Sequence, residues 1–269
     1  MELAIFENDT GEGVVSFQDS GFYTYLTVGG ERVFEFGSPC GTCGIIFRKV
    51  GSVANRLSDP TAVELLEELG AIPPPDVLRR LARVLPPGVY FPSIVAGTVK
   101  LIAPGSSNDY FATDVARLFG RQDIDDAEPV GPRTAYYRLG VDRDLERTGR
   151  IHGTHKALVT AVVMPLHDPA RLNRDRIEYW KRQHHAGMIL TAFAVAVLDN
   201  QAPAMDPADS TYPYEEQFLL TLCPLDGHHR IQAAAELGAP VRILSLLARD
   251  CSFTRSYEDI ATVLSGYLP

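Results

Sequence analysis

Short apolar runs alternate with polar positions and turn residues along the first 50 residues, a pattern typical of β-strands. The clearest case is the pair of segments 22–28 and 31–36, which Gly29 and Gly30 join. Two adjacent glycines can both take a positive φ, as a two-residue type I′ turn requires. The pattern therefore predicts a β-hairpin over these residues.

The next hundred residues mix helical and extended patterns. Apolar residues at helical spacing, with Gly or Pro at the ends, predict helices over residues 61–69, 76–85 and 113–119. Residues 89–102 predict strands that break near Gly97. The polar and acidic stretch 121–153 is punctuated by Pro and Gly, which indicates a linker or an exposed insertion.

The pattern becomes regular from residue 157 onward. Apolar runs of strand length occupy residues 157–164, 190–198, 216–223 and 241–247. Helices are predicted from Asn173 to Gly187, from Gly227 to Leu237 and after Ser256, because Asn and Ser cap helix starts and Gly ends them. We therefore expect an α+β fold, with a β-rich α+β domain of unknown role over residues 1–150 and a mixed-sheet domain over residues 151–269.

Charge and composition narrow the classes of function. The formal net charge of −9 disfavours a protein that coats nucleic acid, although a basic pocket for a small anion remains compatible with it. No apolar run approaches the ~20 residues needed to cross a bilayer, and no signal-peptide pattern opens the chain. Four cysteines in 269 residues do not suggest a disulfide scaffold. These features predict a cytoplasmic protein without a membrane partner.

The junction at Asp226-Gly227-His228-His229-Arg230 carries candidate chemistry. Gly227 permits a tight turn and close approach of a ligand. The amides that follow would open a helix unpaired, and a helix start of this kind attracts anions. Arg230 adds a forked donor that suits phosphate, and the histidines add further donors. The same residues also fit an ordinary helix start that Asp226 caps.

A family resemblance favours the phosphate interpretation. The five residues from Asp226 to Arg230, with Ala233-Ala234 and Gly238 after them, resemble the phosphate-binding signature of the ParB/sulfiredoxin superfamily, and most closely its free-serine-kinase branch. The upstream order of strand, helix, strand and strand is similar to that domain. The resemblance covers residues 157–248, about a third of the chain.

The resemblance implies a nucleotide-dependent phosphotransferase that acts on a small hydroxylated metabolite such as a free amino acid. ATP or ADP with Mg²⁺ would be the cofactor, Asp226 to Arg230 would hold the phosphates, and Asp168 and His229 would be catalytic. The branch uses a glutamate near Asp168, and this chain has none before Glu178. Asp168 equally fits a cap before Pro169.

The alternative is a nucleotide-binding switch without turnover, whose first part docks a protein partner or a second copy of the chain. Two other branches of the superfamily fit less well. The loop lacks the cysteine of sulfiredoxin, and no helix-turn-helix segment of the ParB type follows the domain.

The pair Cys40 and Cys43 is a second candidate, because its spacing suits two zinc ligands. His152 and His155 have the same spacing and would complete a Cys₂His₂ set. A redox pair and two structural thiols are the other interpretations.

Overall fold

The computed structural model describes residues 3–19, 24–36, 48–51, 71–112, 134–140, 142–149, 153–201 and 214–267. The helices predicted over residues 61–69 and 113–119 lie outside these ranges, as do Cys40, Cys43 and His152.

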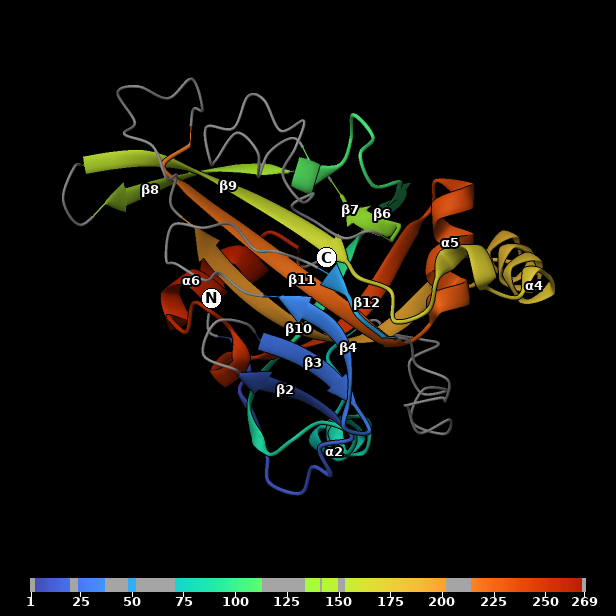
Figure 1. Cartoon of the computed structure of the whole chain (residues 1–269), viewed down its shortest axis with the longest axis horizontal. Coiled ribbons are helices and arrows are strands. Elements are labelled where there is room, and N and C mark those ends of the chain that lie inside the picture. Colours follow the sequence, from blue (N-terminus) through green and yellow to red (C-terminus); the bar gives the residue numbers. More distant parts are fainter. Residues whose placement is uncertain are drawn as a thin grey trace.

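A large mixed sheet forms the middle of the molecule (Figure 1). Its strands run in the order β1-β6-β12-β10-β11-β9-β7, and β8 pairs with β9. They are β1 (Phe6–Asn8), β6 (Gly88–Ile102), β7 (Tyr136–Leu139), β8 (Arg143–Gly149), β9 (Gly153–Val163), β10 (Leu190–Gln201), β11 (Glu216–Asp226) and β12 (Pro240–Ala248). The pairs β10–β12 and β9–β11 are parallel and the other pairs are antiparallel.

The α+β class predicted from the sequence is confirmed. The division expected near residue 150 falls between the end of β8 and the start of β9, and the sheet takes strands from both sides of it. Strand β6, from the first part, lies between β1 and β12 and also pairs with β7. The two expected parts therefore share one sheet.

The small sheet contains β2 (Val15–Asp19), β3 (Thr24–Val28), β4 (Glu31–Phe36) and β5 (Arg48–Lys49) in sequential order. The predicted hairpin is confirmed: β3 and β4 pair antiparallel, with φ of 60° at Gly29 and 86° at Gly30. Figure 1 shows the small sheet lying across one face of the large sheet.

The described helices of four residues or more are α2 (Pro75–Ala82), α4 (Arg174–His185), α5 (His228–Leu237) and α6 (Tyr257–Ser265), and two 3₁₀ turns are η1 (Pro169–Arg171) and η2 (Arg249–Cys251). The predicted caps are present: Asn173 accepts the N–H of Arg176, and Ser256 accepts that of Asp259. Helix α2 starts one residue before the predicted Asp76, with Pro75 at its first position, where the missing N–H costs nothing.

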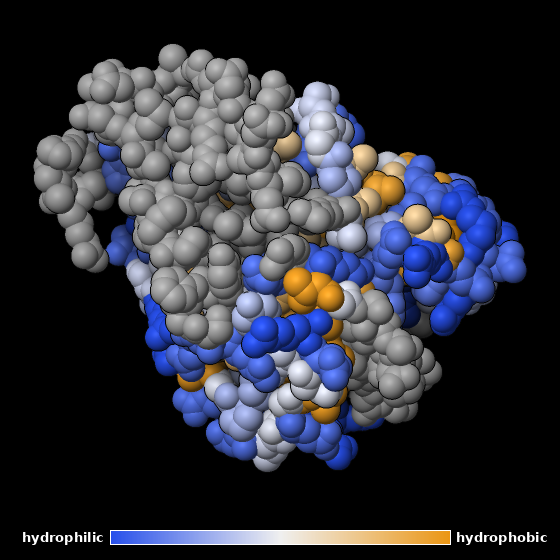
Figure 2. Space-filling view, in the orientation of Figure 1, coloured by the Kyte–Doolittle hydropathy of each residue, from blue (hydrophilic) through white to orange (hydrophobic). Residues whose placement is uncertain are grey.

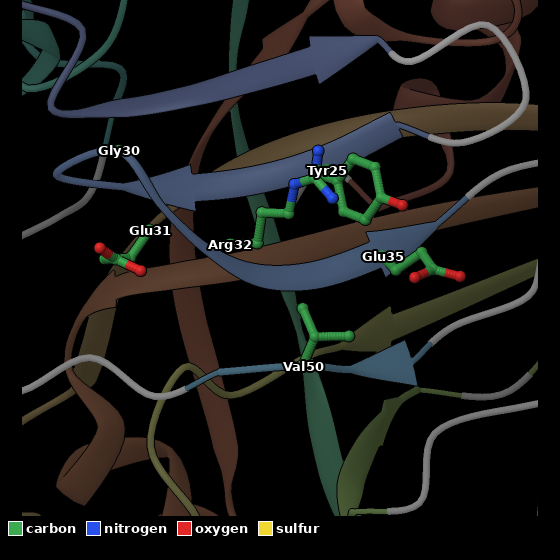
Figure 3. A pocket seen from close by; sticks show the side chains of 6 residues that line it. All are labelled: Tyr25, Gly30, Glu31, Arg32, Glu35 and Val50. Atoms are coloured by element: carbon green, nitrogen blue, oxygen red, sulfur yellow. The ribbon is translucent and has the colours of Figure 1, made fainter.

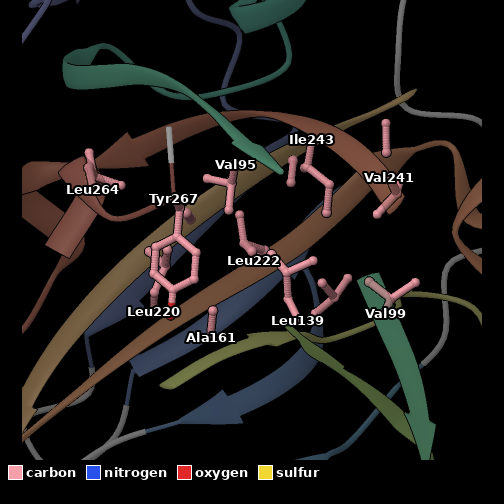
Figure 4. Close-up of a cluster of buried hydrophobic side chains, with 14 of the residues drawn as sticks. Val95, Val99, Leu139, Ala161, Leu220, Leu222, Val241, Ile243, Leu264 and Tyr267 are labelled. Atoms are coloured by element: carbon pink, nitrogen blue, oxygen red, sulfur yellow. The ribbon is translucent and has the colours of Figure 1, made fainter. Parts of the chain in front are cut away.

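Side chains of the central strands alternate between two cores, as the period of a β-strand requires. On one face Ala192, Ala194 and Ala196 pack with residues of α5 and α6, and Figure 4 shows part of this cluster. On the other face Phe193 and Val195 pack with side chains of α2 and the small sheet. The fold therefore has three layers: α4, α5 and α6 lie on one face of the large sheet, and the small sheet and α2 lie on the other.

Two sequence-based expectations were wrong. Strand β6 runs unbroken through Gly97, because Gly97 stays paired with Val241. The described part of the stretch read as a linker contains strands β7 and β8, where Tyr136 and Tyr137 are buried. Acidic residues on β8 had hidden its strand character. No helix in the described ranges is long and apolar enough to span a membrane.

Candidate functional site

The predicted phosphate loop lies where β11 ends at Asp226 and α5 begins at His228. Gly227 has φ of 90°, a left-handed conformation that favours glycine. A Cβ added there would lie 2.7 Å from Cβ of Ala192 and 3.0 Å from the carbonyl oxygen of Thr191. The turn therefore packs tightly against the start of β10. Glycine is required at position 227 both because φ is positive and because a side chain would not fit.

The first turn of α5 presents backbone donors. Its N-cap is Gly227, which has no side chain to cap the helix, so Asp226 does not fill the cap position. The intrahelical ladder starts with the N–H of Ile231, which donates to the carbonyl of Gly227 at 2.9 Å. Among the described residues no acceptor is found for the amides of His228 and His229. These donors and the positive end of the helix dipole suit an anion.

His228 is buried behind this turn. Its ring meets the ring of His167 edge to face, with 4.6 Å between centroids. Burial, followed by the charges of His167, His229 and Lys49, lowers the pKa of His228 to about 3. The imidazole is therefore neutral at pH 7, and its Nε2 has no hydrogen-bond partner in the described part of the chain. A buried polar atom without a partner carries an unrecovered desolvation cost.

His229 connects α5 to the start of α4. Its Nε2 accepts the backbone N–H of Asn173 at 3.2 Å, so that nitrogen carries no proton. Burial and the positive charges of Arg176 and His167 lower its pKa, and Asp226 opposes them. The predicted catalytic histidine thus already holds a structural hydrogen bond.

Arg230 faces the protein rather than solvent, with 8% of its surface exposed. Its Nη1 donates to the carbonyl of Thr191 at 3.3 Å and lies 3.7 Å from Oδ2 of Asp226. Its guanidinium lies 4.3 Å from the ring centroid of Trp180 on α4. The side chain of Arg230 therefore packs between the loop, the start of β10 and helix α4.

Asp168, the predicted base, lies in the connection between β9 and α4. Its Oδ1 accepts the N–H of Ala170 at 3.0 Å and caps η1, as the alternative interpretation expected. The side chain is 41% exposed, and its Oδ2 lies 3.8 Å from Nε of Arg171. Glu178, the nearest glutamate in sequence, instead bonds to Arg174 and Lys181 on α4.

Two residues of this region, Lys49 and His167, were not among the predicted site residues. Lys49 lies on β5 of the small sheet and interacts electrostatically with Asp168, Arg171, His167 and His228. His167 contacts His228 directly, and burial and Lys49 lower its pKa. His167 could have been predicted as a site residue, because it is next to the predicted base Asp168 in the sequence. No local sequence pattern connects Lys49 to a loop about 180 residues later.

A separate hollow of about 590 Å³ lies on the small sheet (Figure 3). Arg32 stacks on Tyr25 within it, 3.9 Å from the ring centroid. The other lining residues are Gly30, Glu31, Glu35 and Val50. None of the predicted site residues lines it.

The described residues contain no cluster of three or more His, Cys, Asp or Glu that fits a metal ion. His155 of the predicted zinc set bonds to Glu216 at 2.9 Å, and its proposed partners lie outside the described ranges. Burial raises the thiol pKa of Cys223 to about 12 and that of Cys251 to about 11, which makes both poor nucleophiles.

Comparison of the chain with protein-family models, curated proteins and solved structures yields no match. The resemblance to the ParB/sulfiredoxin superfamily stays a prediction that rests on the loop residues.

Proposed function

We propose that this chain binds a nucleotide through its phosphates at the amino-terminal end of α5. The observation that carries the proposal is the pair of amides at His228 and His229, without acceptors among the described residues, beside the unpartnered Nε2 of His228. A phosphate oxygen would accept both N–H groups, and a protonated Nε2 of the neutral ring would add a third donor.

The remaining loop residues support this anion site. Gly227 sets the turn that aims the amides. Arg230 holds the loop against Thr191 and Trp180 and adds positive charge behind it. Asp226 partly neutralises Arg230, at 3.7 Å. The loop thus suits an anion that is bound mainly by backbone donors.

Mg²⁺ would enter with the nucleotide. It binds through oxygen atoms and keeps several of its waters, so it needs only one or two carboxylates beside the phosphates. Asp168 and Asp226 are the carboxylates near this loop, and both already contact arginines. When bound, the ion would neutralise phosphate charge.

A thermal-shift screen with ATP, ADP and CTP, each with Mg²⁺, tests the proposal, because ligand binding raises apparent stability by mass action. Nucleotides should raise the midpoint of the wild type. His228→Leu, which keeps an apolar body but lacks Nε2, should bind about tenfold more weakly, as expected for one lost bond to a charged group. His184→Gln, at the far end of α4, is the control. If no nucleotide shifts the wild type, the proposal is wrong.

Phosphoryl transfer to a small hydroxylated metabolite is the second candidate, and the partly exposed carboxylate of Asp168 favours it. A positioned base contributes about 10²–10⁴-fold to such a reaction. Asp168→Asn keeps an oxygen that can cap η1 but removes the base. Turnover of ATP with free hydroxy-amino acids should fall by about that factor, while the shift caused by nucleotide without Mg²⁺ stays. Binding without any turnover in the wild type would instead support the switch.

A further inference from the structure

Strand β5 brings a lysine from the small sheet to the loop region. Lys49 pairs with Phe34 of β4, and its Nζ lies 5.9 Å from the ring centroid of Phe34. Phe34 belongs to the same packed core as Leu166, the residue before His167. Figure 1 shows the small sheet beside the connection from β9 to α4. The position of Lys49 is therefore set by core packing.

Within the described part of the chain, the charges that act on Lys49 do not balance. Its ammonium is half-buried, and among the described groups that act on its pKa only Asp168 is acidic, whereas Arg171 repels it. Lys49 in turn disfavours protonation of His167 and His228. A surplus of positive charge in a partly buried place is a cost to the fold, and a bound anion would offset it.

We infer that Lys49 contacts the phosphate bound at the start of α5, so that the small sheet supplies one wall of the site. This inference rests on the proposed function and gives the first part of the chain a role in it. A lysine ammonium is a compact point charge on a flexible stem, able to follow a phosphate chain beyond the reach of the fixed amides. Its contribution should rise with the charge of the ligand.

Isothermal titration with inorganic phosphate, pyrophosphate, ADP and ATP tests the inference. Lys49→Gln should weaken ATP binding about tenfold or more, as for a lost bond between charged groups, and phosphate binding by less. Lys49→Arg should restore most of the affinity because it keeps the charge. Lys100→Gln, an exposed lysine on β6, is the matched control and should match the wild type.

Two outcomes are distinguishable. If the wild type binds none of the probes, the proposed function and this inference both fail. If Lys49→Gln binds ATP as tightly as the wild type does, the inference fails and the phosphate site stands.

Lysine labelling of the wild type avoids dependence on the folding of a variant. Acetylation followed by peptide mass spectrometry should show that ATP protects Lys49 and leaves Lys100 unchanged. Equal labelling of Lys49 with and without saturating ATP would overturn the inference.

Discussion

The guanidinium of Arg230 lies over the ring of Trp180, 4.3 Å from its centroid, and so joins the first turn of α5 to the middle of α4. Trp180 is the only tryptophan in the chain. The same guanidinium donates to the carbonyl of Thr191 at the start of β10. One buried side chain thus holds together the helix start, the neighbouring helix and the strand against which the loop is pressed. Figure 2 shows mostly hydrophilic residues over α4 outside this contact.

Arg230→Lys should lower the free energy of unfolding by about 1–2 kcal/mol, because lysine keeps the charge but loses the planar stack on Trp180 and the forked donor. Urea unfolding followed by tryptophan fluorescence measures the change, and the native emission should also shift. Arg182→Lys, at an exposed position of α4, is the control. Unfolding curves that coincide for Arg230→Lys and the wild type would show that the stack contributes nothing.

Gly227→Ala should be far more costly than Gly238→Ala. Both glycines have positive φ, at 90° and 62°, so both alanines meet backbone strain of about 1 kcal/mol or more. Only at Gly227 would the Cβ also meet Ala192, at 2.7 Å, whereas at Gly238 nothing lies within 4 Å. Thermal unfolding of the two variants separates strain from overlap. Equal losses of stability would mean that the turn is not pressed onto β10.

The second half of the chain was predictable because its signals are local. Apolar runs gave β9 to β12, and Asn173 and Ser256 marked helix starts by capping them. The site was predictable only in part. Arg230 turns inward to Trp180 because α4 packs against α5. Lys49 reaches the loop because of where the small sheet lies. Neither relation leaves a periodic trace in the sequence. Strand β8 was missed because charged residues break the alternation that marks a strand.

Acid should destabilise the fold through His228. Its pKa falls from 6.5 to about 3 on folding, chiefly through burial, so the folded state binds its proton less readily than the unfolded chain does. Its stabilising contribution is full above pH 6.5 and is lost as the pH falls toward 3.

His228→Gln should remove this sensitivity, which amounts to about 3 kcal/mol between pH 7 and pH 4. Urea unfolding of the variant and the wild type across that range measures it. His184→Gln should keep the wild-type slope. A slope that His228→Gln leaves unchanged would contradict the burial of a neutral ring at this position.

Asp199 should lower the stability of the fold as the pH rises, which is opposite to the effect of His228. It lies on β10, 1% exposed, and burial raises its pKa from 3.8 to about 6 against hydrogen bonds from Gln201 and the backbone of Asn200. Its Oδ1 has no partner among the described residues. The folded state therefore holds this proton more tightly than the unfolded chain does. The contribution to stability is full below pH 3.8 and declines as the pH rises through 6.

A shift of about two units in the pKa of Asp199 corresponds to a change of about 3 kcal/mol in the free energy of unfolding. Asp199→Asn keeps an oxygen for Gln201 and removes the buried charge, so it should stabilise the protein above pH 6, with a gain that shrinks toward pH 4. Denaturant unfolding at pH 4, 6 and 8 measures the difference, and the exposed Asp9→Asn should show none of it. If the gain at pH 8 is absent, the carboxylate has a partner in solution, because only a compensated charge could remain ionised there without cost.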